Sequence, residues 1–289
     1  MLPLWLTCML AHDTPTMIRT LICVAACTAL LGCAPKPKTQ VAAPTGHWIS
    51  LFNGRNLEGW TVKIAGQDVG DNYRNTFRVA DGLLQVSYQQ YDKFGDRFGS
   101  LFYNTKLSRY WIRAQYRFVG KAAAGAPGWT YKNSGIQLHS QSPQSMRKEQ
   151  QFPVSVEFDI VGGWFVGSRP TGDVCHYGTR VLLGGAPLKT LCSKVGDITI
   201  RDDEWVTILA EVDGGRRVRQ IVNGALVVEY TDLTLDDGNP DAQRLMASGA
   251  SKALTSGYLS IQSNGYPIEF KRIEVLPLDV EMAGQDAHR

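Results

Sequence analysis

The sequence predicts an all-β domain of two packed antiparallel sheets, and three observations support this prediction. Short segments that alternate apolar and polar residues follow one another from Trp48 onward, the pattern of half-buried strands. The 29 glycines fall between these segments, as turn-rich β proteins require. No long stretch has the period of a helix, and no repeat of a propeller blade's length is visible.

The strands can be placed in chain order from this alternation. Two hairpin turns, Asp81-Gly82 and Asn223-Gly224, fix the registers on either side of them. We expect strands at residues 77–79, 83–86, 110–119, 135–139, 154–161, 205–212, 218–228, 258–263 and 268–276. Helices are not expected.

Alternation also predicts which side chains share a face. In residues 110–119, Arg113 and Arg117 face away from the core, opposite the apolar set Ile112, Ala114, Tyr116 and Phe118. In residues 135–139, Gln137 and His139 lie opposite Ile136 and Leu138.

The segment VSVEFDIVGG, residues 154–163, places two carboxylates on one strand face. Val156, Phe158 and Ile160 would face the core, and Glu157 and Asp159 the other side. That other side is either solvated surface or the floor of a site.

The first 33 residues read as a leader rather than as part of the fold. From Met17 the chain has a short basic start, an apolar run and then Leu-Leu-Gly-Cys ending at Cys33, which resembles a bacterial lipoprotein signal. The resemblance implies a start at Met17, lipidation of Cys33 and an N-terminal membrane anchor. Ala34 after the cysteine favours the outer membrane, facing the periplasm. An ordinary cleaved signal peptide is the alternative.

Residues 34–46 are rich in Pro, Ala and Lys and predict a flexible tether, followed by the β domain at 47–278 and a tail at 279–289. Removal of the leader leaves Cys175 and Cys192 as a pair in an oxidising compartment. We expect a disulfide that stabilises the fold by roughly 3 kcal/mol on the loop-entropy model. Two thiol ligands for a metal would be the alternative, but no CxxC spacing supports it.

Composition limits the class of partner. The formal net charge is +3, with 20% charged and 44% hydrophobic residues, and no basic run is interleaved with aromatic residues. Nucleic acid is therefore not an expected partner.

Four segments in order resemble one family. They look like segments of the family once called DUF1080. The segments are LFNGRNLEGW at 51–60, NSGIQLHS at 133–140, the pair EWVTILAEVDGG and RQIVNGALVVEY between 204 and 230, and GYLSIQSNGYPIEFKRIEV at 257–275. That family is described as 3-keto-disaccharide hydrolase, or 3-keto-glucoside-1,2-lyase/hydratase. The resemblance implies a concanavalin-like jelly-roll sandwich. In the closing segment the family often has His before the glycine, where this chain has Asn264.

The resemblance also implies a chemistry. A sugar 3-oxidoreductase first makes the C3 ketone, which acidifies the proton at C2, and this protein then cleaves the glycosidic bond as a lyase or hydrolase. Such a reaction needs a base, an acid for the leaving oxygen and a group that holds the enolate charge. A divalent metal held by carboxylates and histidine would suit the last role, although no cofactor is certain.

Strand phase alone selects the candidate residues. Glu157, Asp159 and His139 are the candidate catalytic residues and the candidate metal ligands. The candidate substrate-binding residues are Arg113, Arg117, Gln137, Asn133 and Trp164. The alternative for the two acids is a solvated strand face.

Two further functions are compatible with the fold that the sequence predicts. Laminarinase-type glucanases carry Glu-x-Asp-x-x-Glu on a concave strand, and this chain matches Glu157 and Asp159 but has Gly162 at the third position. Retaining hydrolysis by that acid pair is therefore not expected. A carbohydrate-binding module without chemistry would use the same fold, and convergence of Glu157, Asp159 and His139 in one pocket would favour the enzyme.

Overall fold

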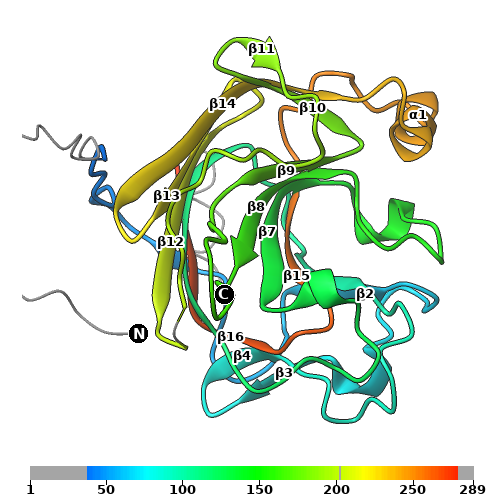
Figure 1. Cartoon of the computed structure of the whole chain (residues 1–289). Coiled ribbons are helices and arrows are strands. Elements are labelled where there is room, and N and C mark those ends of the chain that lie inside the picture. Colours follow the sequence, from blue (N-terminus) through cyan, green and yellow to red (C-terminus); the bar gives the residue numbers. More distant parts are fainter. Residues whose placement is uncertain (1–37, 202, 279–289) are drawn as a thin grey trace, which may run out of the picture. The chain divides into compact units, whose positions relative to one another are not determined.

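The computed structural model describes residues 38–201 and 203–278, and in this part of the chain it is an antiparallel two-sheet sandwich. The predicted all-β class is confirmed, and each predicted strand is present. Figure 1 shows the strands β12, β13 and β14 in one layer and β7, β8 and β15 in another. The predicted leader with Cys33 and the predicted tail lie outside the described residues.

The larger sheet has ten strands in the order β11-β10-β14-β13-β12-β6-β16-β4-β3, with β1 also paired to β16. Their bounds are Ile49–Ser50 (β1), Phe77–Ala80 (β3), Leu83–Val86 (β4), Arg109–Phe118 (β6), Thr179–Leu183 (β10), Ala186–Pro187 (β11), Val206–Asp213 (β12), Arg217–Val222 (β13), Ala225–Leu235 (β14) and Ile268–Pro277 (β16).

The smaller sheet has six strands in the order β2-β5-β15-β7-β8-β9. Their bounds are Trp60–Ile64 (β2), Gly99–Tyr103 (β5), Asn133–Ser140 (β7), Ser155–Val161 (β8), Val174–Tyr177 (β9) and Tyr258–Ser263 (β15). The strands β7 and β8 pair with Gln137 opposite Glu157, so this sheet carries the two acids.

The core lies between the two sheets and is built from the apolar side of each alternating strand. Along β6 the side chains of even-numbered residues 110–118 are buried, and those opposite them are partly exposed, as the alternation predicts. Ile112 and Ala114 of the larger sheet meet Ile136, Leu138 and Phe158 of the smaller one. This packing leaves the other face of the smaller sheet for the polar side chains.

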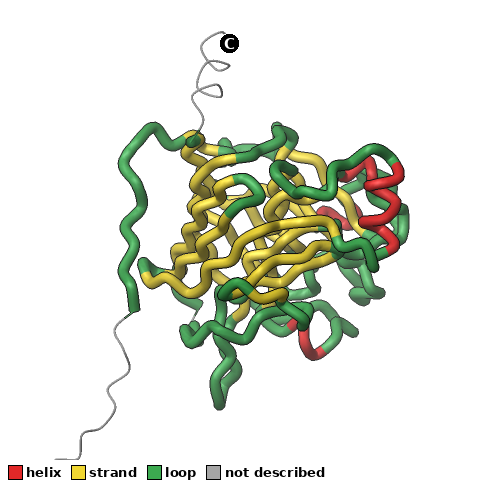
Figure 2. Tube along the Cα trace, turned by 90° about the horizontal axis from the view of Figure 1, so that it is seen from above, coloured by secondary structure: helices red, strands yellow, loops and turns green. Residues whose placement is uncertain are grey.

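One α-helix, α1 (Pro240–Ala247), departs from the prediction that helices are absent in the described residues. It lies in the connection from β14 to β15, and Figure 2 shows it among the loops at one side of the strand layers. The Asn239 side chain accepts from the backbone N–H groups of Asp241 and Ala242, and Pro240 occupies the first helical turn. The Asn-Pro dipeptide is a helix-start signal that can be recognised in the sequence.

Part of the predicted tether pairs with the domain. Gln40 forms an isolated bridge with Ala225, and Val41 N–H donates to Gly224 O at 2.8 Å. Among the described residues, none forms a helix long and apolar enough to cross a bilayer.

Candidate active site

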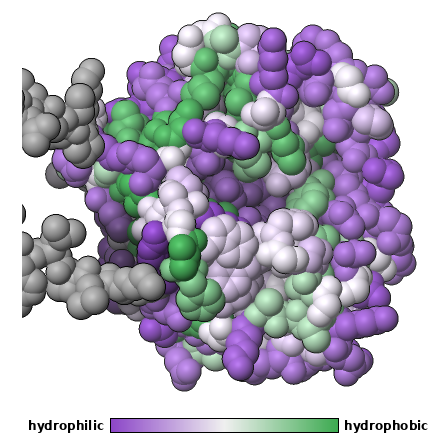
Figure 3. Space-filling model, viewed as in Figure 1, coloured by the Kyte–Doolittle hydropathy of each residue, from purple (hydrophilic) through white to green (hydrophobic). Residues whose placement is uncertain are grey.

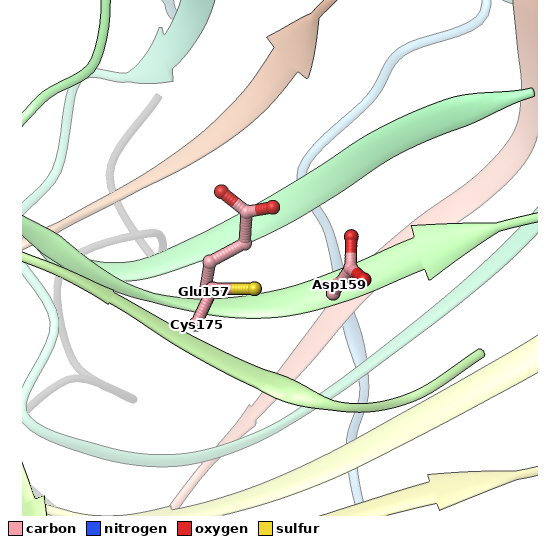
Figure 4. Close-up of side chains that lie close together, drawn as sticks. All are labelled: Glu157, Asp159 and Cys175. Carbon is pink, nitrogen blue, oxygen red and sulfur yellow. The ribbon is translucent and has the colours of Figure 1, made fainter. Parts of the chain in front are cut away.

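Glu157 and Asp159 lie side by side on the face of β8 that points away from the core. Figure 4 shows both side chains on the same side of the strand. Their closest carboxylate oxygens lie within 4.8 Å of one another. Glu157 is only 1% exposed, whereas Asp159 stays partly exposed. The alternative of a solvated strand face therefore does not hold for Glu157.

A row of amide side chains continues from Glu157 across the neighbouring strands. Gln262 Nε2 on β15 donates to Glu157 Oε2 at 2.9 Å. Asn264 Nδ2 donates to Gln262 Oε1 and, at 2.5 Å, to Asn133 Oδ1. Asn133, a predicted substrate-binding residue, thus lies at the far end of a polar row that begins at the acid pair.

Gln137 lies opposite Glu157, as strand phase predicts. Its Oε1 accepts from Ser100 Oγ at 2.9 Å and from Ser260 Oγ at 2.7 Å, and the side chain is fully buried. These two hydroxyls fix the amide, so its position beside Glu157 is set by three strands of the sheet.

Gly135 provides the space in which the Glu157 carboxyl lies. A Cβ at position 135 would stand 2.5 Å from Glu157 Cδ and 2.5 Å from Oε1, far inside contact distance. A side chain at this position of β7 would displace the carboxyl group. The glycine in NSGIQLHS is therefore explained by its neighbour on β8.

Burial is the main electrostatic influence on the two acids. Loss of hydration raises the pKa of the Glu157 carboxyl well above its usual range, the Asp159 charge raises it further, and the amides of Gln137 and Gln262 oppose this increase. Burial, followed by the charge of Asp173, raises the pKa of Asp159 to about 7, against the positive charge of Arg169. Burial and the neighbouring acid thus favour the protonated form of Glu157, and Asp159 is near its midpoint at neutral pH.

A chain of aromatic rings runs beside the acids. Burial raises the pKa of the Tyr177 hydroxyl on β9, and the nearby charges of Glu157 and Asp159 raise it further. Its ring stacks on Phe152 (5.0 Å between centroids), Phe152 packs on Phe98 (5.1 Å), and Phe98 stacks on Trp129 (5.5 Å). Figure 3 shows a recess lined by hydrophilic residues near the middle of this face, close to where Figure 1 draws β7, β8 and β9.

Arg169 ties the loop after β8 to the loop before β7. Its Nη1 donates to the Tyr131 carbonyl and, at 2.8 Å, to the Gly162 carbonyl, and its Nη2 donates to Trp129 O at 3.1 Å. Its guanidinium lies 4.5 Å from the ring centre of Trp164, which also stacks on Tyr131. Trp164, a predicted substrate-binding residue, thus lies beside a cation that acts on Asp159.

The prediction that His139 joins the acids is wrong. A β-bulge in the β7–β15 pairing gives His139 a φ of 49°, so the strict alternation of β7 fails there. The ring turns to the core side, where Nε2 donates to Gly214 O at 3.0 Å and the ring meets Tyr110 edge-on. Burial lowers the pKa of His139 to about 4, which keeps it neutral.

Arg113 and Arg117, predicted substrate-binding residues, do not lie beside these acids. Both lie on β6 of the larger sheet and face away from the core, as predicted, but that face is on the other sheet from Glu157. Arg113 pairs with Glu274 and lies over Trp48, and Arg117 pairs with Glu269 at 2.8 Å.

The metal hypothesis loses His139, one of its three predicted ligands. The ligand atoms of Glu157, Asp159 and Cys175 lie within 4.8 Å of one another, which is a geometry that could hold an ion. Cys175 is, however, joined to Cys192 in the predicted disulfide, so its sulfur is not a free thiolate, and His139 lies elsewhere. Two carboxylates alone do not fit a site of three protein ligands, and no step below passes through a metal.

The structure also explains why the glucanase pattern stops at Gly162. A Cβ at this position would stand 2.6 Å from Lys132 Cδ and 2.8 Å from Lys132 Cβ. The lysine side chain occupies the space that a third acid would need. The pair used by laminarinase-type enzymes is therefore absent from this strand.

Sequence reasoning missed Gln262, Tyr177 and Arg169. Gln262 had a readable signal, because it alternates with Ile261 in a predicted strand of a family-like segment. Tyr177 follows the predicted disulfide cysteine by two residues and so shares its strand face. Arg169 lies in a loop, where alternation gives no information.

A family model matches most of the domain. The model described as "3-keto-alpha-glucoside-1,2-lyase-like domain" matches residues 47–276. The chain belongs to this family. The 3-keto-glucoside lyase-like domain, formerly DUF1080, thus covers both sheets and all residues of the polar row.

Several solved structures resemble this lyase-like domain at low sequence identity. A putative glycosyl hydrolase from Parabacteroides distasonis is 18% identical, with 81% of this chain and 100% of that chain covered and a TM-score of 0.48. A Bacillus subtilis protein of unknown function with a galectin-like fold is 12% identical (76% and 90% covered, TM-score 0.45). The laminarinase of Rhodothermus marinus is 10% identical (80% and 95% covered, TM-score 0.47). A comparison with curated proteins finds no match.

Proposed function

We propose that this domain cleaves 3-keto-glycosides by removing the proton at C2, with Asp159 as the base and Glu157 as the acid. The observation that carries the proposal is the acid pair on β8, whose carboxylate oxygens lie within 4.8 Å of one another and whose pKa values both lie above the usual range. A base with a pKa near the working pH and a neighbouring acid that keeps its proton is what this reaction needs.

The reaction balances with these two residues. Asp159 takes the proton from C2, and the electron pair forms the enolate of the C3 ketone. The bond from C1 to the leaving oxygen then breaks as Glu157 gives that oxygen its proton. Water adds to C1 of the resulting enone and passes a proton to Glu157, while Asp159 returns its proton to C2. Both side chains end in their starting states.

The surroundings of the pair suit the charges that develop. Amide groups of Gln137 and Gln262 lie beside Glu157 and are uncharged donors for a developing enolate oxygen. The Tyr177 hydroxyl, whose pKa is raised, keeps its proton and can also donate. Aromatic rings next to a polar floor are the usual walls of a sugar site.

The direct test compares amide variants with a control on the other sheet. Glu157→Gln and Asp159→Asn keep the shape of each side chain and remove the proton transfer. We expect kcat on a chromogenic 3-keto-glucoside to fall by about 10²- to 10⁴-fold in each variant, with an unchanged melting profile or a more stable one. Glu274→Gln, which alters an acid of the larger sheet, is the control. Unchanged release by both acid variants would remove the pair from the mechanism.

The pH profile gives a second readout. Because Asp159 must be ionised, kcat/KM should rise as the pH increases through about 7 and should fall again where Glu157 loses its proton. If the wild type binds oligosaccharides but cleaves no keto substrate at any pH, the protein is a carbohydrate-binding module instead.

The setting of this reaction is part of the proposal. The lipoprotein-like leader ending at Cys33 supports a lipid anchor in the cell envelope, at the outer membrane facing the periplasm. The substrate ketone would come from a sugar 3-oxidoreductase acting earlier. Labelling with a palmitate analogue, lost in Cys33→Ser, tests the anchor.

A further inference from the structure

Four large apolar side chains are exposed on the loops before β7 and after β8. The exposed fractions are 92% for Phe165, 86% for Val166, 50% for Trp129 and 40% for Trp164. We call these four residues the apolar rim. Large apolar side chains that gather on a surface usually mark a binding site, whereas isolated ones do not.

Arg169 connects the apolar rim to the reacting groups. Its guanidinium contacts the ring of Trp164 at 4.5 Å and the carbonyl oxygen of Trp129 at 3.1 Å, and its charge lowers the pKa of Asp159. Phe165 packs near Tyr131, which stacks on Trp164. The two loops that carry the rim, one before β7 and one after β8, are therefore held beside the end of β8 that carries Asp159.

Members of the rim differ in how much surface they offer. Trp164 is engaged by Tyr131 and Arg169, so its ring mainly holds the loops together. Trp129 stacks on the buried Phe98 with an angle of 7° between planes, which fixes the indole and leaves half of the residue exposed. The exposed apolar surface of the rim is therefore mainly that of Trp129, Phe165 and Val166.

We propose that this surface binds the leaving group of the substrate, and that this group is a planar aromatic alcohol; this inference rests on the proposed function. Phe165 and Val166 carry no polar side-chain atom, and the Trp129 indole has a single N–H, so the hydroxyls of a second sugar would gain little here. A phenyl ring stacks on a fixed indole and removes apolar surface from water. The side chains thus select aryl 3-keto-glucosides over 3-keto-disaccharides.

The test measures a selectivity ratio, because phenols leave more readily than alkyl alcohols in any enzyme. The ratio of kcat/KM for phenyl over methyl 3-keto-glucoside is compared between the wild type, Trp129→Ala and the double variant Phe165→Ser/Val166→Ser. The intrinsic leaving ability of each alcohol is the same for every variant, so it cancels when the ratios of two proteins are compared. We expect the ratio to fall about 10-fold in each variant. Val69→Ser, which alters another exposed apolar residue, is the matched control and should keep the ratio. An unchanged ratio in both rim variants overturns the proposal.

Binding separates this proposal from the proposed function. In Glu157→Gln, calorimetric titration gives Kd values for the phenyl and methyl compounds without turnover. Tighter phenyl binding that is lost in the rim variants supports the rim even if the wild type cleaves nothing. Binding of the wild type to phospholipid vesicles that is lost in Phe165→Ser/Val166→Ser, together with equal Kd values for the two sugars, would overturn it in favour of a membrane-contacting surface.

Discussion

Carboxylates stand on the outward faces of both sheets, but their surroundings differ. On the larger sheet Glu211 pairs with Arg217 and Arg219, and Glu269 and Glu274 pair with arginines of β6. On the smaller sheet, Glu157 and Asp159 form no ion pair with any described residue and have mainly amides, aromatic rings and another acid around them. The first arrangement is what a solvated β surface produces. The second destabilises the charged forms of the acids, and groups perturbed in this way cluster at functional sites.

The largest effect on stability that we predict concerns the disulfide at the edge of the acid face. Cys175 lies opposite Glu157, and the double variant Cys175→Ser/Cys192→Ser opens a loop between residues 17 apart. We expect a loss of about 3 kcal/mol in the free energy of unfolding, or roughly 6 to 12 °C in Tm. Calorimetry measures it, and a Tm within 1 °C of the wild type would contradict the prediction.

The next effect concerns the space that Gly135 leaves for the Glu157 carboxyl group. Gly135→Ala pushes a methyl group into the carboxyl, so we expect kcat to fall about 10- to 100-fold through misplacement. Gly238→Ala, where the nearest atom to a new Cβ is 3.4 Å away, is the control. Equal activities of the two variants would show that the carboxyl moves without consequence.

A smaller effect should appear in the pH dependence of stability. The pKa of Asp159 is raised in the folded state, so its favourable contribution is present below the unfolded pKa near 4 and is lost as the pH rises through about 7. Asp159→Asn should therefore be more stable than the wild type at pH 8 and equal to it at pH 4. The full shift corresponds to about 4 kcal/mol, and solvent screening of the partly exposed Asp159 reduces the expected difference at pH 8 to about 2 kcal/mol. Urea unfolding at both pH values measures this, and a variant less stable at pH 8 would reverse the sign.

The smallest effect is expected on the ion-paired face. Glu274→Gln removes the partner of Arg113, which is itself partly exposed. We expect a loss below about 1 kcal/mol and no change of kcat. A loss as large as that predicted for the disulfide would erase the contrast between the two faces.

The sequence allowed the sheets and the acid pair to be predicted, because one physical rule governs both. Alternation places Val156, Phe158 and Ile160 in the core and so must place Glu157 and Asp159 opposite. The same rule failed at His139, where one bulge residue breaks the period without any mark in the sequence.

What lies over the acids could not be predicted. The aromatic rings that continue from Tyr177 and the guanidinium that acts on Asp159 come from loops, which carry Phe152, Trp129 and Arg169. Loop paths of this kind are set by packing between distant segments, and local periodicity contains no record of them. Strand alternation therefore predicts which face of the sheet the acids occupy, and tertiary packing determines whether that face is exposed to solvent.

The disulfide has a consequence for solubility that goes beyond stability. The strand β9 is the last in its sheet, and residues Leu191 to Ser193 run along its free side, where Leu191 O accepts from His176 N–H and Ser193 N–H donates to Val174 O. Cys192 fastens this short segment in place, so it covers backbone groups that could otherwise recruit a strand from a second molecule. Reduced protein should accordingly form intermolecular β aggregates before it loses its fold.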